Sequence, residues 1–193
     1  MKPSTLRHVF NFWPPFLFAG IHVTRMSADW REARVELRMR PWTKNYVGTH
    51  FGGSLFSMTD PFWMILVKEC LGSDYIVWDK AAEIEFVKPG KGTVHAQFKV
   101  EDSVLDEIRA ATANGDKTLR WLPVEVIDQQ GDVVARIRKQ IYVRRKPGRR
   151  PIQGESFLFY LCLFACSGTA QLPSWRLSRL PAWSYNAVAS APA

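Results

Sequence analysis

The chain has 193 residues, and 47% of them are hydrophobic, which excludes an intrinsically disordered protein and predicts one compact domain. Lys and Arg number 26 against 18 Asp and Glu, and the net charge of +8 favours an anionic partner such as a phosphorylated ligand, a nucleic acid or a membrane surface. The longest apolar run, residues 157–165, is about half of the roughly 20 residues that a transmembrane helix requires, so we predict no membrane span.

Cysteine and histidine usage excludes two further classes of protein. Cys70, Cys162 and Cys166 have neither the paired spacing of a zinc site nor the density of a disulfide scaffold. We therefore expect a reducing compartment and a cytoplasmic protein. No two histidines have the spacing of metal ligands, and the sequence predicts neither a metal nor a cofactor.

The N-terminal segment is apolar enough to resemble a signal peptide, but Pro14-Pro15 interrupts its apolar stretch. We predict instead an amphipathic helix over residues 3–13 that the two prolines end. A change in composition then divides the chain into a domain of residues 1–146 and a C-terminal tail of residues 147–193. The tail is rich in Pro, Ser, Ala and Trp, so we predict that it is weakly ordered.

Alternating apolar and polar residues predict six strands in the domain. They are residues 20–27, 34–40, 75–87, 93–101, 118–127 and 133–145. The first two are predicted to pair. The glycine-bearing segments 88–92 and 128–132 predict antiparallel hairpins between the strands that flank them. A short helix is predicted over residues 103–113.

Residues 53–71 carry apolar side chains on nearly every side of a helix, so this helix must be buried. In a soluble domain, a buried helix of this length requires a sheet wrapped around it. The sequence therefore predicts an α+β fold in which a helical N-terminus precedes a long central helix wrapped by a curved, antiparallel six-stranded sheet.

The candidate site lies where an irregular loop enters the central helix. The Gly52-Gly53 pair allows close approach of a ligand, and the N–H groups at a helix start are unpaired donors that can hold an oxyanion. Asp60 is the one acid in an apolar stretch, so we expect it to be partly desolvated and suited to act as a general base or a nucleophile. Asn45 adds an amide that could orient a water molecule or a carbonyl group.

Each of these residues also has a purely structural interpretation. Asp60-Pro61 is a common helix start, which would split the segment into two helices. The glycine pair could serve tight packing of the helix on the sheet, and Asn45 could close a turn of the loop. His50 could contact a ligand or be a solvated loop residue.

Eight residues separate Gly52 from Asp60, a rise of roughly 12 Å along one continuous helix. The two groups could not then reach one carbonyl within a single chain. If two chains pair with their central helices antiparallel, the glycine of one chain faces the aspartate of the other across a two-fold axis. We therefore predict a homodimer, which could pair further into a homotetramer.

Asn45, Gly52-Gly53 and Asp60, with this spacing and strand order, resemble the motif of the hotdog-fold thioesterases over residues 1–146. The similarity is greatest to the phenylacetyl-CoA thioesterase-like branch or a closely related subgroup. This resemblance implies hydrolysis of an acyl-CoA-type thioester. It further implies that Asn45 orients water or substrate, that a glycine N–H polarises the thioester carbonyl, and that Asp60 of the other subunit is the base or nucleophile.

Four positions in and after the motif affect what can be transferred from that family. Phe51 stands where the family usually has histidine, with His50 one position early, and we predict that both contact the substrate. Pro61 and Met64 follow the acid, in a region where relatives often carry a hydroxyl group. These departures favour the alternative of a hotdog module that binds acyl-CoA or a fatty acyl group without hydrolysing it.

Arg144 and Arg145 begin a basic stretch that is typical of a solvated strand end, but that could also meet the phosphates of coenzyme A. We include both as candidate substrate contacts. A basic nucleic-acid-binding protein is a third possibility, but no aromatic residues are interleaved with basic ones on a predicted sheet face. A hotdog dehydratase would need a histidine placed against the acid, and His50 is offset from that position.

Overall fold

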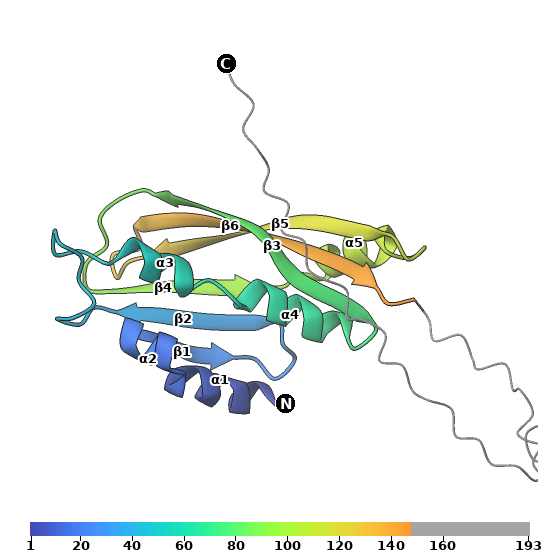
Figure 1. Ribbon diagram of the computed structural model, residues 1–193, viewed down its shortest axis with the longest axis horizontal. Helices are drawn as coiled ribbons and strands as arrows, with labels where there is room; N and C mark the ends of the chain where they lie inside the picture. Colours follow the sequence, from blue (N-terminus) through green and yellow to red (C-terminus); the bar gives the residue numbers. More distant parts are fainter. Residues whose placement is uncertain (148–193) are drawn as a thin grey trace, which may run out of the picture. The chain divides into compact units, whose positions relative to one another are not determined.

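The computed structural model describes residues 1–147 of the chain (Figure 1). The elements in chain order are α1 (Pro3–Phe12), α2 (Pro14–Ala19), β1 (Ile21–Met26), β2 (Glu32–Arg38), α3 (Gly52–Ser57), α4 (Phe62–Leu71), β3 (Tyr75–Phe86), β4 (Thr93–Lys99), α5 (Asp102–Ala111), β5 (Lys117–Ile127) and β6 (Val133–Arg145). The strands form one antiparallel sheet in the order β1-β2-β4-β5-β6-β3. This arrangement confirms the predicted α+β fold. The predicted tail lies outside the described residues apart from Pro147, and the division at that point stays a prediction.

The adjacent prolines after α1 end that helix as predicted, but they also begin a second helix, α2, which the sequence analysis did not expect. Proline is tolerated in a first helical turn, where its missing N–H would have no partner. Trp13, between the two helices, has the extended backbone that the residue before a proline favours. Phe10 of α1 and Phe16 of α2 stack together, and their ring centroids lie 5.8 and 6.3 Å from that of Phe62 in α4.

The predicted central helix of residues 53–71 is divided into α3 and α4, which follow one another across the sheet (Figure 1). Pro61 lies in the break, because a proline cannot donate the N–H bond that continues a helix. Asp60 precedes it but does not cap α4, since no side-chain cap bond is made at that helix start. The rise along a single continuous helix therefore does not give the distance between Gly52 and Asp60.

The structure corrects one of the two predicted hairpins. β5 and β6 form the expected hairpin around residues 128–132, with Ile127 opposite Val133. Residues 88–92 do not form one, because β3 pairs with β6 while β4 pairs with β2 and β5. This segment instead carries the chain from the edge strand β3 to the middle of the sheet. Glycine and proline indicate a chain reversal in both segments, but they do not specify the partner of the next strand.

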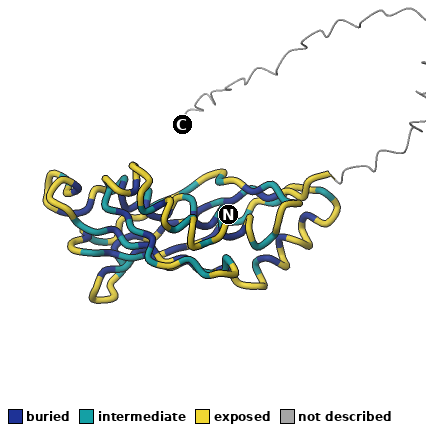
Figure 2. The backbone as a smooth tube through the Cα atoms, turned by 90° about the horizontal axis from the view of Figure 1, so that it is seen from below, coloured by how far each residue is buried: buried dark blue, intermediate teal, exposed yellow. Residues whose placement is uncertain are grey.

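The core lies between the sheet and the central helical segment, and buried and exposed positions alternate along the strands (Figure 2). Phe62 and Leu66 of α4 are fully buried, as are Met58 in the break and Phe98 of β4. The ring centroids of Phe62 and Phe98 are 5.1 Å apart. Full burial of each such side chain stabilises the fold by about 1.5–3 kcal/mol, so the break between α3 and α4 is held firmly against the sheet.

The two edge strands of the sheet differ in whether another part of the chain bonds to their outer backbone groups. At the β1 edge, the side chain of Asn11 in α1 accepts a hydrogen bond from the N–H of Val23 at 2.7 Å and donates one to the carbonyl of Val23 at 3.1 Å. These bonds satisfy backbone groups that β1 cannot offer to a neighbouring strand. β3 forms the other edge, and no strand of residues 1–147 lies on its outer side.

Candidate functional site

The loop before α3 is held by Asn45. Its Nδ2 donates hydrogen bonds to Oγ1 of Thr49 at 2.8 Å and to the carbonyl of His50 at 3.1 Å, while its Oδ1 accepts from the N–H groups of Val47 and Thr49 at 3.1 and 2.9 Å. Gly48, with a φ of +78°, provides the left-handed conformation that this tight loop needs. The amide of Asn45 thus uses both donors and both acceptor positions within the loop. It positions the start of α3 and has no N–H left to orient a water molecule.

His50 connects this loop to the segment that follows β3. Its backbone N–H donates to the carbonyl of Gly90 at 3.0 Å, and its Nε2 lies 2.8 Å from the carbonyl of Gly92. The residue is only 3% exposed, so the interpretation as a solvated loop histidine is wrong. Burial lowers the pKa of His50, although the Gly92 carbonyl partly opposes this effect. The Nδ1 atom has no hydrogen-bond partner among residues 1–147.

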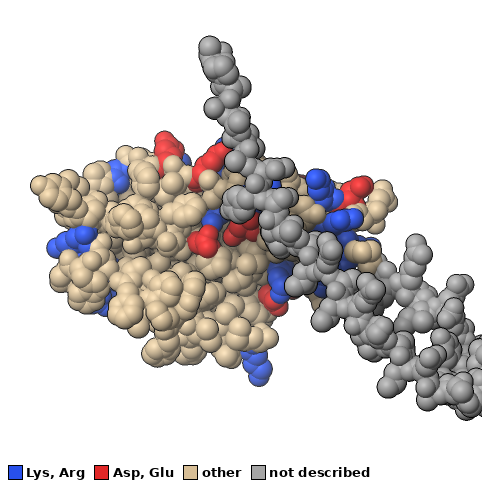
Figure 3. All heavy atoms as spheres, in the orientation of Figure 1, with Lys and Arg blue, Asp and Glu red and all other residues tan. Residues whose placement is uncertain are grey.

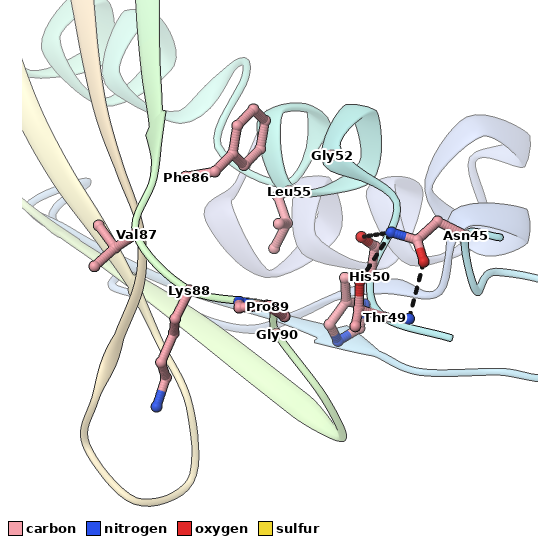
Figure 4. Close-up of a pocket in the computed structure, with 10 residues that line it drawn as sticks. All are labelled: Asn45, Thr49, His50, Gly52, Leu55, Phe86, Val87, Lys88, Pro89 and Gly90. Atoms are coloured by element: carbon pink, nitrogen blue, oxygen red, sulfur yellow. Dashed lines mark hydrogen bonds between the residues drawn. The ribbon is translucent and has the colours of Figure 1, made fainter. Parts of the chain in front are cut away.

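A pocket of about 370 Å³ opens between the start of α3 and the end of β3 (Figure 4). Its lining residues come from the Asn45 loop, α3 and the segment from the end of β3, and are Asn45, Thr49, His50, Gly52, Leu55, Phe86, Val87, Lys88, Pro89 and Gly90. A Cβ at Gly52 would lie 2.9 Å from Cζ of Phe86, so a glycine is what allows this aromatic ring to approach the helix. The pocket is therefore narrow and largely apolar beside α3.

The glycine pair also begins α3, with Phe51 as the residue before the helix. At this position the N–H groups of Gly52 and Gly53 have no helical acceptor, and no backbone or side-chain partner within residues 1–147 takes them. A Cβ at Gly53 would lie 2.4 Å from Cε1 of Phe51, so packing also explains that glycine. Phe51 itself is largely exposed. The geometry is compatible with both predicted roles of the pair, donor and packing.

Asp60 lies in the break between α3 and α4, where its carboxylate bonds to Nζ of Lys139. The side chain of Asp60 is 53% exposed, so the expected desolvation of this acid is wrong. Lys139 of β6 is only 3% exposed, and its Nζ also lies 3.9 Å from Oδ2 of Asp79 and 4.7 Å from the ring centroid of Phe56. Asp60 is not among the residues that line the pocket at Gly52. One chain therefore does not combine the two groups in one cavity.

Asp79 is the second carboxylate beside Lys139, and it is partly buried on β3. Burial raises the pKa of Asp79, the Lys139 ammonium lowers it, and the nearby charge of Asp60 raises it again. Sequence analysis missed both Lys139 and Asp79. The signal was nevertheless present, because Lys139 occupies an inward-facing position between the fully buried Ile137 and Ile141, where alternation predicts an apolar residue.

The structure places Arg144 and Arg145 away from the pocket. They end β6, whereas Val134 near the other end of that strand accepts bonds from the N–H groups of Val87 and Lys88 at the pocket. Ten residues at about 3.3 Å each place Val134 and Arg144 roughly 33 Å apart. Nε of Arg144 donates to the carbonyl of Gly115 at 3.1 Å, as expected of a solvated strand end. A single chain therefore does not bring the two arginines to the glycine pair.

Two properties of residues 1–147 bear on the class of site. They contain no cluster of three or more His, Cys, Asp or Glu side chains that could hold a metal ion. None of their helices is long and apolar enough to cross a membrane.

Comparison with known proteins identifies the family. The model of a family described as a domain of unknown function, DUF4442, matches residues 4–143. The chain belongs to the DUF4442 family. This DUF4442 chain matches no curated protein. Its match to the family covers every helix and strand of the described domain except the first residue of α1 and the last two of β6.

Solved structures with the same fold come from several bacteria. A Pseudomonas aeruginosa protein described as a probable thioesterase has a TM-score of 0.66 at 18% identity, over 75% of the DUF4442 chain and 97% of its own. A Haemophilus influenzae thioesterase has a TM-score of 0.55 at 10% identity, covering 78% and 95% of the two chains. The PaaI protein from the phenylacetic acid degradation operon of E. coli has a TM-score of 0.52 at 20% identity, covering 75% and 93%. The likeness confirms the hotdog fold that the motif predicted.

Proposed function

We propose that this protein hydrolyses an acyl-CoA-type thioester as a homodimer, with each site built from two chains. The observation that carries the proposal combines two features: a glycine pair with free N–H groups, of which Gly52 lines the pocket, and a half-exposed carboxylate on the same helical segment but outside that pocket. These are the two halves of an acyl-transfer site, an oxyanion binder and a base or nucleophile. Within one chain they do not meet, so the second half comes from the partner.

The open edge of the sheet supports pairing of this kind. β3 is twelve residues long and has no strand on its outer side within residues 1–147. Phe86, on this strand, is 57% exposed and also lines the pocket, so the pocket adjoins the open edge. A two-fold axis perpendicular to the sheet at the open side of β3 would continue the sheet into a second copy with antiparallel central helices, and would set each pocket against the partner's helical segment.

The chemistry follows from the two halves. The N–H of Gly52 or Gly53 would bind the thioester oxygen as negative charge develops, a contribution of about 3 kcal/mol for one such donor. Asp60 of the partner would take a proton from the attacking water or attack the carbonyl itself, with the thiolate of coenzyme A as leaving group. Asn45 acts through the loop that it holds, because its amide is already fully hydrogen-bonded.

The surroundings of the pocket suit an acyl group. The pocket is walled by Leu55, Phe86 and Val87, and the visible surface around α1, α2 and α3 is largely uncharged (Figure 3). His50 and Phe51 stay proposed substrate contacts, the first as a buried lining residue and the second as an exposed ring at the start of α3. Arg144 and Arg145 could meet phosphates only as part of the partner chain.

The test is hydrolysis of a panel of acyl-CoA thioesters by the parent protein and by Asp60→Asn. We expect kcat to fall at least about 100-fold in the variant, which is the usual loss for a missing general base. Asp106→Asn is the matched control, because Asp106 is an exposed carboxylate on α5 that pairs with Arg109. An Asp60→Asn protein as fast as the parent would contradict the catalytic assignment.

A non-catalytic acyl-CoA or fatty-acyl binding module is the second candidate. It is favoured by the fully occupied amide of Asn45, which leaves no side-chain amide to orient the attacking water. Calorimetric titration with an acyl-CoA that the protein binds but does not hydrolyse would decide for this module over the enzyme.

A further inference from the structure

We propose that Lys139 is a positioning residue for the Asp60 carboxylate, with Asp79 holding its ammonium from the other side. This inference deepens the proposed function and rests on it. The three side chains come from β6, the helix break and β3, so the fold alone brings them together. The cluster lies on the helical segment that also carries the glycine pair.

The first step of the argument is the burial of Lys139. Its side chain is 3% exposed and stands between Ile137 and Ile141, which are fully buried on the same face of β6. An ammonium group in such a position loses its hydration, and an apolar side chain of similar length would fill the same space at lower cost. Packing therefore does not explain a lysine here.

The second step is the exposure of its partner. Asp60 is 53% exposed, so water alone could solvate this carboxylate and it needs no lysine to be stable. The contact uses Oδ1 of Asp60, and Oδ2 has no hydrogen-bond partner among residues 1–147. Lys139 thus fixes one oxygen from the interior and leaves the other available, which is the arrangement required of a base or nucleophile.

The third step is the way Lys139 is itself held. Its Nζ lies 4.7 Å from the ring centroid of Phe56 in α3 and 3.9 Å from Oδ2 of Asp79. Oδ1 of Asp79 is buried and has no partner among the described residues. When Asp60 takes up a proton from the attacking water, the Lys139 cation would keep Asp79 as its counter-ion. Asp60 therefore contacts a cation that a second carboxylate also holds.

The experiment compares Lys139→Met with the parent and with Lys99→Met, a control at an exposed lysine on β4 that pairs with exposed Glu101. We expect kcat of Lys139→Met to fall at least about 30-fold while KM changes less than about threefold. The reason is that the Asp60 carboxylate loses its orientation, whereas the pocket that binds the substrate is unchanged. A change that only weakened the fold would not separate kcat from KM in this way, so the split between the two constants is the readout of a positioning role.

Fold stability is the control for a purely structural role. Lys139→Met leaves the partly buried Asp79 carboxylate without its counter-ion, so its unfolding midpoint should fall, and kcat is compared at a temperature at which both proteins are folded. Lys139→Gln is the second variant should the methionine protein not fold, and the same loss of kcat is expected. Lys139→Arg, which keeps the charge, should keep most of the parent's kcat.

The inference is overturned if kcat of both neutral variants matches that of the parent. If the parent hydrolyses no thioester, the proposed function fails, but crystal structures of the parent and of Lys139→Met still test the role of Lys139. An Asp60 carboxylate that has one orientation in the parent and several in the variant would support that role. The same single orientation in the two proteins would overturn it.

Discussion

The two edges of the sheet differ in how their backbone groups are satisfied. At β1, a side chain from α1 accepts from and donates to the backbone of Val23, which is fully buried. At β3, twelve residues form an edge whose outer side is bare in the described part of the chain, with Trp78 and Phe86 exposed along it. A long open edge is a template for pairing with another chain. At the β1 edge the chain itself satisfies backbone groups, whereas the β3 edge is suited to pair with a second copy.

The open edge is also the one next to the chemistry. Phe86 ends β3 and reaches the glycine pair, and Asp79 on the same strand faces the Lys139 ammonium. The covered edge carries no residue of the candidate site. If β3 pairs with a second copy, association and activity should be lost together, whereas changes at β1 should affect stability alone.

The largest effect is expected from Ala81→Lys. Ala81 is exposed beside a bulge near the middle of β3, next to Lys80, so two copies paired there would oppose four positive charges around a two-fold axis. We expect dissociation to monomers in sedimentation velocity and a loss of about 100-fold or more in thioester hydrolysis. Thr24→Lys on β1 is the control and should change neither. A dimeric, active Ala81→Lys protein would exclude pairing through β3.

Asn11→Leu should affect the covered edge and leave the other unchanged. It removes the donor and the acceptor that satisfy Val23, and backbone groups left buried without partners cost about 2 kcal/mol in the free energy of unfolding. Urea unfolding and faster hydrogen exchange at the Val23 amide would measure the loss. The control Asn114→Leu lies in the exposed turn after α5 and should be neutral. Equal stability of Asn11→Leu and the parent would refute the proposed closure of β1.

A smaller effect is expected from Gly52→Ala at the contact between α3 and the open edge. The new methyl group would lie 2.9 Å from Cζ of Phe86, a half-exposed ring that can move away. We expect kcat/KM to fall about tenfold as the pocket narrows, with little change in stability. Phe86→Ala should restore part of the activity in the double variant. Failure of this rescue would separate Phe86 from the site.

The smallest effect is expected on the pH dependence of stability, from one histidine at the pocket and one on β1. Burial lowers the pKa of His50 at the pocket, and burial followed by the charge of Arg38 lowers that of His22 on β1, both below the ordinary value of 6.5. The unfolded chain therefore binds protons first, so stability is fully present above pH 6.5 and is lost as the pH falls through the folded pKa values. His50→Gln and His22→Gln should each flatten the loss of stability as the pH falls below 6.5 in urea unfolding. An unchanged slope would contradict that histidine's contribution.

Local sequence patterns determined the fold class and most element positions. Alternation located every strand within about two residues, and the apolar segment located α3 and α4. Proline signalled both helix breaks, but its tolerance in a first turn meant that α2 began where only an end was expected. These features depend on neighbours in the chain, which is why sequence alone could predict them.

In the candidate site, too, some features could be predicted from local sequence and others depended on tertiary contacts. The glycine pair and Asp60 were found from the sequence because their chemistry is unusual where they stand. The burial of His50, the commitment of Asn45 to its loop and the exposure of Asp60 depended on contacts that the sequence does not state. Lys139 was visible as a charge at an apolar position, but its partners come from two distant elements.

The sequence by itself determined the periodicities, the breaks and the residues capable of chemistry. Only the tertiary structure decided that β3 pairs with β6, that segment 88–92 crosses over instead of turning back, and that Lys139 meets Asp60. The physical reason is that pairing and burial are set by the total packing of the sheet against α4. No short stretch of chain carries enough interactions to specify its own distant partner.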